Sequence, residues 1–68
     1  MAAKARITGS NKNYGLQATV HKDRKQQPVV TFDKVDLLAN PERRAILTTV
    51  GVAKARRFAQ WILDNTEE

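Results

Sequence analysis

The sequence contains no cysteine, one histidine and one serine, and aromatic residues make up 6% of its 68 residues. The lack of cysteine excludes disulfides, thiol catalysis and metal sites built on cysteine. Because His21 and Ser10 are the only residues of their types, a nucleophile, a base and an orienting group of the usual kind cannot be assembled. The sequence therefore predicts a protein that is not an enzyme and that holds no cofactor and no metal.

Long hydrophobic runs are also missing. No stretch is apolar or long enough for a secretory signal or a membrane span, which predicts a cytoplasmic protein. A chain of this length is expected to form one domain over 1–68, with 1–4 flexible. Without disulfides or a metal, a core of this size contributes only about 3–5 kcal/mol. Pairing into a homodimer is one way to add stability, and the sequence leaves it open.

The chain is basic, with 12 lysines and arginines against seven acids, a net charge of +5 and a pI near 10.1. The excess lies in the first 25 residues, where Asp23 is the only acid among six basic residues: Lys4, Arg6, Lys12, Lys22, Arg24 and Lys25. A local excess of positive charge is typical of a surface that faces phosphates, although charge for solubility alone gives a similar balance. The composition favours a polyanionic partner.

Two segments alternate apolar and polar residues as half-buried strands do. In 14–22, one face carries Tyr14, Leu16, Ala18 and Val20, which we expect to border the core, and the other face carries polar residues. Residues 28–33 predict a second strand, and 5–8 a short first one. The two longer strands are expected to form an antiparallel hairpin with the basic run His21-Lys22-Asp23-Arg24-Lys25 at its tip.

Residues 34–50 allow two interpretations. Asn40 as N-cap and Pro41 as the first helical residue predict a short helix over 41–49. The β-branched run Thr48-Thr49-Val50 instead favours strands over 35–38 and 45–50. Both interpretations stay open, because local capping supports the first and strand propensity the second.

The clearest pattern is at the C-terminal end, where Gly51–Asn65 predicts an amphipathic helix with Gly51 as its N-cap. One stripe is apolar and is expected to hold the domain together: Val52, Ala55, Phe58, Ala59, Ile62 and Leu63. A second stripe, opposite the first, carries Lys54, Arg57 and Trp61. The predicted fold class is α+β, an antiparallel sheet of three to four strands packed against this C-terminal helix, with the 41–49 helix as an optional addition.

The function that these features favour is binding of nucleic acid, with single-stranded DNA slightly preferred. Positive side chains and an aromatic platform for base stacking are what such binding requires. The predicted contact residues are Lys22, Arg24, Lys25, Arg43, Arg44, Lys54, Arg57 and Trp61. In the order of its elements, strands carrying Lys22 and a closing helix carrying Lys54, the chain resembles the PC4-like single-strand binders.

Two alternatives remain. The first is a protein-interaction module, such as a small inhibitor or adaptor of a larger enzyme of phage or plasmid type, in which Trp61 and Arg57 bind an acidic protein. The second is a helix-turn-helix regulator over 45–62, with its turn at Gly51. In that motif the position six residues after the turn glycine is apolar, whereas here it is Arg57.

Overall fold

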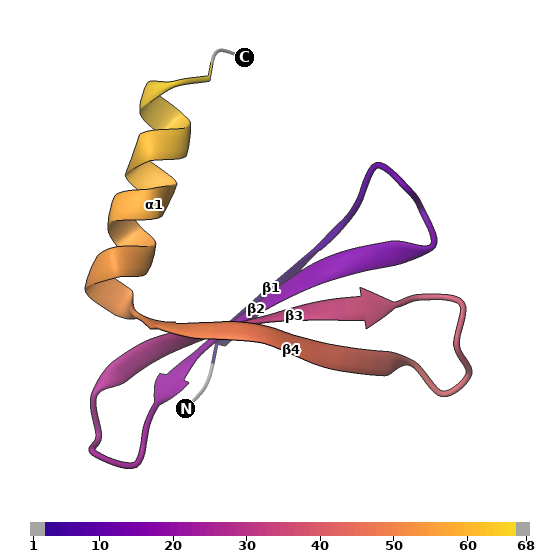
Figure 1. Ribbon diagram of the computed structural model, residues 1–68, viewed down its shortest axis with the longest axis horizontal. Helices are drawn as coiled ribbons and strands as arrows, with labels where there is room; N and C mark the ends of the chain where they lie inside the picture. The colour runs from indigo at the N-terminus through magenta and orange to yellow at the C-terminus, as the bar shows by residue number, and fades with distance from the viewer. Residues whose placement is uncertain (1–2, 67–68) are drawn as a thin grey trace.

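The computed structural model describes residues 3–66, which form four strands followed by one helix (Figure 1). The strands are β1 (Ala3–Thr8), β2 (Tyr14–Lys22), β3 (Pro28–Asp36) and β4 (Arg43–Gly51), and the helix is α1 (Val52–Asp64). Each strand pairs antiparallel with the next, so the sheet order is β1-β2-β3-β4. The predicted α+β fold, a small antiparallel sheet with a C-terminal helix, is confirmed.

The two strands with the clearest alternation lie where the sequence predicts them. β2 has the predicted bounds, and β3 starts at Pro28 but continues three residues past the predicted end. β1 begins at Ala3, so Ala3 and Lys4 of the segment expected to be flexible are strand residues. Met1 and Ala2 lie outside the described residues.

The helix predicted over 41–49 is wrong, because β4 occupies this segment. The strand predicted over 35–38 is not separate either, since Val35 and Asp36 end β3. Pairing with β3 outweighs the capping chemistry of Asn40 and Pro41. The β-branched residues Thr48, Thr49 and Val50 of β4 all pair with residues of β3. The Thr31 and Thr49 hydroxyls, for example, are hydrogen-bonded across the two strands at 3.0 Å. A helix-turn-helix over 45–62 therefore lacks its first helix.

The pairing register separates the sheet into two faces. Arg6, Gln17 and Asp33 fall on one face, which we call the polar face. This face also carries Thr19, His21, Thr31 and Arg44, and with them the valines Val29 and Val35. The other, which we call the apolar face, carries Ile7, Leu16, Ala18, Val20, Val30 and Phe32, with Tyr14, Lys34, Asp36 and Arg43 at one end. The register shifts between Phe32 and Asp33, where Leu47 is the extra residue of a bulge in β4.

Burial on these faces differs from the sequence-based expectation. Gln17 and Asp33 of the polar face are 3% and 8% exposed, whereas Leu16 and Val20 of the apolar face are 36% and 43% exposed. Arg6 explains part of the difference, because its guanidinium covers the polar face. Its Nε and Nη2 donate to Oε1 of Gln17 at 3.2 and 2.9 Å, and its Nη1 donates to Oε2 of Glu42 at 2.9 Å.

The helix begins after Gly51, as predicted, and its C-cap is Asn65. Figure 1 shows α1 rising away from the strands instead of lying along them. None of its residues is buried, and only Val52 and Ala55 are half-buried. The prediction that the apolar stripe of this helix holds the domain together is therefore wrong for a single chain, because most of the stripe meets solvent.

The buried apolar residues of the described chain are three valines of β3: Val29, Val30 and Val35. Close packing of backbone beside this core depends on Gly15 of β2. A Cβ atom at Gly15 would lie 2.8 Å from the backbone oxygen of Ile7 in the neighbouring strand. The β1–β2 pair can therefore keep its spacing only if position 15 has no side chain.

We expect Gly15→Ala to lower the free energy of unfolding by about 1–3 kcal/mol, because β1 must move to relieve the clash. Gly51→Ala is the matched control, since a Cβ there meets nothing within 4 Å. Urea unfolding followed by circular dichroism measures both variants. Equal stability of the two would contradict the close approach of β1 and β2.

Candidate nucleic-acid interface

The predicted contact residues lie in three groups. Lys22 ends β2, and Arg24 and Lys25 are exposed in the turn that follows, so we call these three the hairpin cluster. Asp23 holds this turn in place, because its Oδ1 accepts the backbone N–H groups of Lys25 and Gln27, both at 2.9 Å. The only acid of the basic run is thus used within the turn, while the cations project into solvent.

Arg43 and Arg44 lie at the opposite end of the sheet. Arg43 pairs with Asp36 at the end of β3, whereas Lys22 pairs with Pro28 at its start. At about 3.3 Å per residue, the two ends of this strand are about 26 Å apart. As neighbours in a strand, Arg43 and Arg44 point to opposite faces of the sheet. The structure therefore does not bring these arginines to the hairpin cluster.

The third group lies on α1. Lys54, Arg57 and Trp61 are all exposed, Trp61 at 60%. The indole ring of Trp61 stacks on Phe58, with ring centroids 6.3 Å apart and an angle of 9° between the planes. Trp61 thus extends the apolar stripe at its edge, which the sequence-based view of two opposed stripes did not anticipate.

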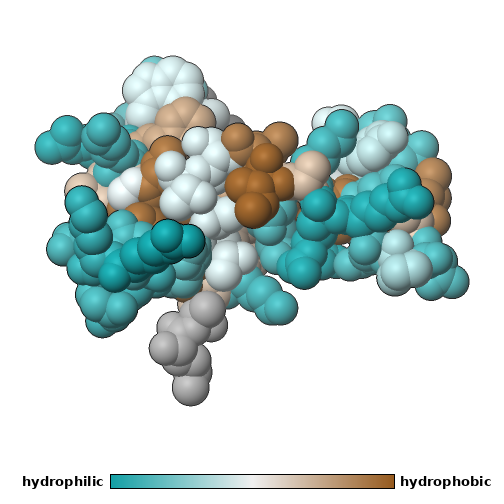
Figure 2. Space-filling model, turned by 60° about the horizontal axis from the view of Figure 1, so that its bottom comes forward, coloured by the Kyte–Doolittle hydropathy of each residue, from teal (hydrophilic) through white to brown (hydrophobic). Residues whose placement is uncertain are grey.

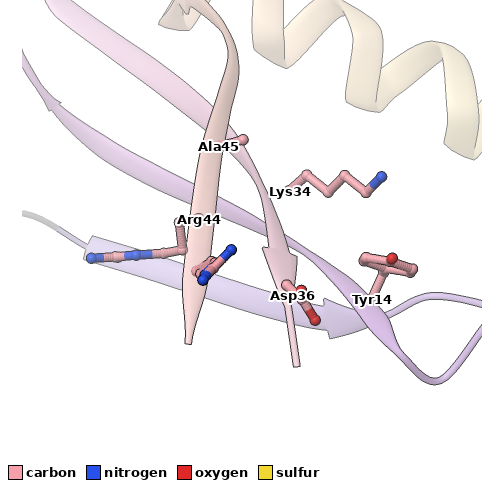
Figure 3. A pocket seen from close by; sticks show the side chains of 6 residues that line it. Tyr14, Lys34, Asp36, Arg44 and Ala45 are labelled. Atoms are coloured by element: carbon pink, nitrogen blue, oxygen red, sulfur yellow. The ribbon is translucent and has the colours of Figure 1, made fainter. Parts of the chain in front are cut away.

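A hollow of about 290 Å³ lies at the end of the apolar face where Arg43 is found (Figure 3). We call it the Tyr14 hollow. It is lined by Tyr14, Lys34, Asp36, Arg43, Arg44 and Ala45, which come from three strands. Figure 3 shows Lys34 and Tyr14 on the same side of the sheet, with Arg44 pointing the other way.

Within the Tyr14 hollow, Lys34 Nζ lies 4.5 Å from the centroid of the Tyr14 ring, a cation–π contact. Oδ1 of Asp36 accepts the backbone N–H of Leu38 at 3.1 Å and so caps the turn after β3. Tyr14 is 40% exposed, which leaves ring surface open to a ligand. An exposed aromatic ring beside Lys34, in a hollow that Arg43 also lines, suits a planar, negatively charged ligand unit such as a nucleotide.

Sequence reasoning missed Lys34 and Asp36 as site residues and expected Tyr14 at the edge of the core. These positions meet because Tyr14 pairs with Asp36, which in turn pairs with Arg43. The alternation within each strand indicates which face a residue occupies. Only the two registers, of β2 with β3 and of β3 with β4, bring the four side chains together.

A second hollow, of about 600 Å³, lies on the polar face. The imidazole of His21 and the hydroxyl of Thr31 are already engaged there, since His21 Nε2 and Thr31 Oγ1 are 2.6 Å apart. Asp33 Oδ1, although buried, has no hydrogen-bond partner among the described residues. Because Asp33 and Glu42 both line this hollow with Arg44, its charge does not favour an anion.

Comparison of the chain with protein-family models, curated proteins and solved structures finds no match. Within residues 3–66, no group of three or more histidine or acidic side chains is arranged to hold a metal ion. The helix in this part of the chain is not long and apolar enough to cross a membrane. The function is therefore inferred from the geometry of the site.

Proposed function

We propose that this protein binds nucleic acid without catalysing a reaction, and that single-stranded DNA is the favoured form. The observation that carries the proposal is the Tyr14 hollow, where an exposed aromatic ring lies beside Lys34 and Arg43. Stacking of a base on an aromatic ring, together with cations for the phosphates, is the usual chemistry of single-strand binding. In a duplex the bases are already stacked on each other and cannot reach such a ring.

In this proposal a base stacks on Tyr14, while Lys34 and Arg43 contact the flanking phosphates. The carboxylate of Asp36 accepts a hydrogen bond from an amino group on the base edge. The hairpin cluster, about 26 Å away along β3, contacts phosphates further along the strand. Arg44, Lys54 and Arg57 extend the positive surface, and the net charge of +5 attracts the polyanion from a distance.

Tyr14→Ala tests the proposal. Loss of one stacked base costs about 1–3 kcal/mol, so the affinity for a single-stranded oligonucleotide is expected to fall about 5- to 150-fold. Tyr14→Phe keeps the ring and is the matched control, with affinity close to that of the unmodified protein. Fluorescence anisotropy of a labelled oligonucleotide measures all three. Unchanged affinity in Tyr14→Ala would remove the main support for the proposal.

A second candidate function is that of a protein-interaction module, such as an inhibitor or adaptor of a larger enzyme of phage or plasmid type. The observation in its favour is the exposed pair Phe58 and Trp61, since tryptophan beside arginine is typical of interface hot spots. It predicts that Trp61→Ala abolishes binding of an acidic protein, whereas alanine at the hairpin cluster has little effect. Nucleic-acid binding predicts the larger loss at the hairpin cluster.

A further inference from the structure

A single copy of this chain exposes more surface than a folded protein of its mass should. The accessible surface is 6059 Å² for 7.7 kDa, whereas a compact monomer of that mass exposes about 4,300 Å². The radius of gyration is 13.4 Å, against about 11 Å for a compact chain of this length. About 1,700 Å² of surface is therefore in excess, as expected for one half of a larger unit.

Several large apolar side chains of α1 are exposed. Phe58, Trp61, Ile62 and Leu63 are 61%, 60%, 41% and 68% exposed. The apolar face of the sheet adds three further exposed side chains, Ile7, Leu16 and Val20. Figure 2 shows brown, hydrophobic surface lying uncovered between teal regions at either side. More large apolar side chains are thus exposed than buried, which is unusual for a soluble domain that acts alone.

We propose that a second copy of the same chain covers this surface, with the two α1 helices packed antiparallel about a two-fold axis. An interface that removes the excess buries about 1,700 Å² on each copy, which lies within the range of obligate homodimers. The Phe58–Trp61 pair lies at the middle of the contact in this arrangement. The apolar stripe then becomes the core of the dimer.

The charges of the helix favour a second copy over an unrelated protein, and antiparallel over parallel packing. Lys54, Arg56 and Arg57 lie in its first half, and Asp64 ends it. With the two-fold axis between Phe58 and Trp61, the antiparallel arrangement places Arg57 opposite Asp64 of the partner subunit, because residues seven apart lie on the same side of a helix. A parallel arrangement instead brings like charges together, at a cost in affinity. The charges of the helix therefore suit antiparallel packing of two copies better than parallel packing.

Sedimentation equilibrium of the full chain, without nucleic acid, tests the pairing. We expect a dimer at micromolar concentration, and Phe58→Glu/Trp61→Glu is expected to weaken dimerisation at least 100-fold, because four charges would enter an apolar contact. Ala53→Glu is the control, since this exposed residue lies on the side of the helix away from the apolar stripe. A monomer at every concentration, or a dimer that survives Phe58→Glu/Trp61→Glu, would overturn the proposal.

A charge-exchange series tests the orientation. Arg57→Glu and Asp64→Arg each reverse the charge on one side of the pair. Circular dichroism checks that each variant keeps its helix, because Asp64 Oδ1 accepts a hydrogen bond from Gln60 Nε2 at 2.8 Å. Each variant alone is expected to weaken the dimer on the order of tenfold, because two symmetric ion pairs become repulsive. The double variant Arg57→Glu/Asp64→Arg is expected to restore it. No recovery in the double variant would contradict the antiparallel packing.

The two proposals are tested separately: the dimer can be rejected while nucleic-acid binding is observed, and nucleic-acid binding can be rejected while the dimer is observed. Sedimentation without nucleic acid reports on the pairing of two copies, and the Tyr14 variants report on a hollow made by residues at one end of β2, β3 and β4. A monomer that binds a single-stranded oligonucleotide would reject the dimer alone. A dimer without affinity for any oligonucleotide would reject the proposed function alone.

Discussion

Val35→Ala is expected to lower the free energy of unfolding by about 2–3 kcal/mol, since it removes two buried methyl groups and leaves a cavity. Val35 is the one apolar side chain among the described residues with an exposure of 0%. The residues that pair with Val35 are Gly15 and Arg44, and neither offers an apolar side chain that could fill the space. For a chain whose whole stability is about 3–5 kcal/mol, this loss lowers Tm by roughly 10–20 °C.

Thermal unfolding followed by circular dichroism measures this loss. Leu38→Ala is the control, because Leu38 is 71% exposed in the turn before β4 and its truncation should cost less than about 0.5 kcal/mol. All variants are compared at one protein concentration, since the stability of a dimer depends on it. Equal melting temperatures for the two variants would mean that the core does not centre on Val35.

The second large effect is expected at the hairpin cluster. Arg24→Ala/Lys25→Ala removes two exposed cations from the tip, and each phosphate contact on a single strand contributes about 0.7 to the log–log slope of affinity against salt. The slope is expected to become shallower by about 1.4, and affinity at low salt to fall roughly 30-fold. The turn itself survives, because Asp23 accepts hydrogen bonds from backbone groups that the substitutions leave in place.

Lys4→Ala/Lys12→Ala is the matched control for charge, since it removes the same two units from β1 and the turn after it. These lysines contribute only long-range attraction in the proposed arrangement, so the loss should be smaller and the slope nearly unchanged. Equal losses in both double variants would show that net charge, and not the hairpin tip, determines the affinity. Oligonucleotide titrations across a salt series distinguish the two outcomes.

The sequence predicts the elements of this fold better than their packing. Alternation over 14–22 and the helical period after Gly51 gave correct bounds, because each is a local property of the chain. The segment before β4 was ambiguous, since Asn40 and Pro41 favour a helix locally while pairing with β3 favours a strand. Long-range pairing decided the outcome, and local sequence does not encode it.

In the candidate site, too, local properties were predicted and long-range contacts were not. Arg43 and Arg44 were predicted as contact residues from their charge. The structure places Arg43 at the Tyr14 hollow, whereas Arg44 borders the hollow but points to the other face of the sheet. Lys34 was missed, because its position over the Tyr14 ring depends on the register between β2 and β3. The apolar stripe of α1 was expected to close the core of one chain. Amphipathic patterning predicts that a surface is covered, but not whether the same chain or a second copy covers it.

Binding of a labelled single-stranded oligonucleotide to the unmodified protein, measured by fluorescence anisotropy from low to physiological salt, tests the central claim most directly. About five phosphate contacts, from the hairpin cluster with Lys34 and Arg43, predict a log–log slope of about −3.5. The same sequence as a duplex is expected to bind more weakly, since its bases cannot stack on Tyr14. A folded protein that does not bind the single strand, or binds it with a slope near zero, would contradict the account.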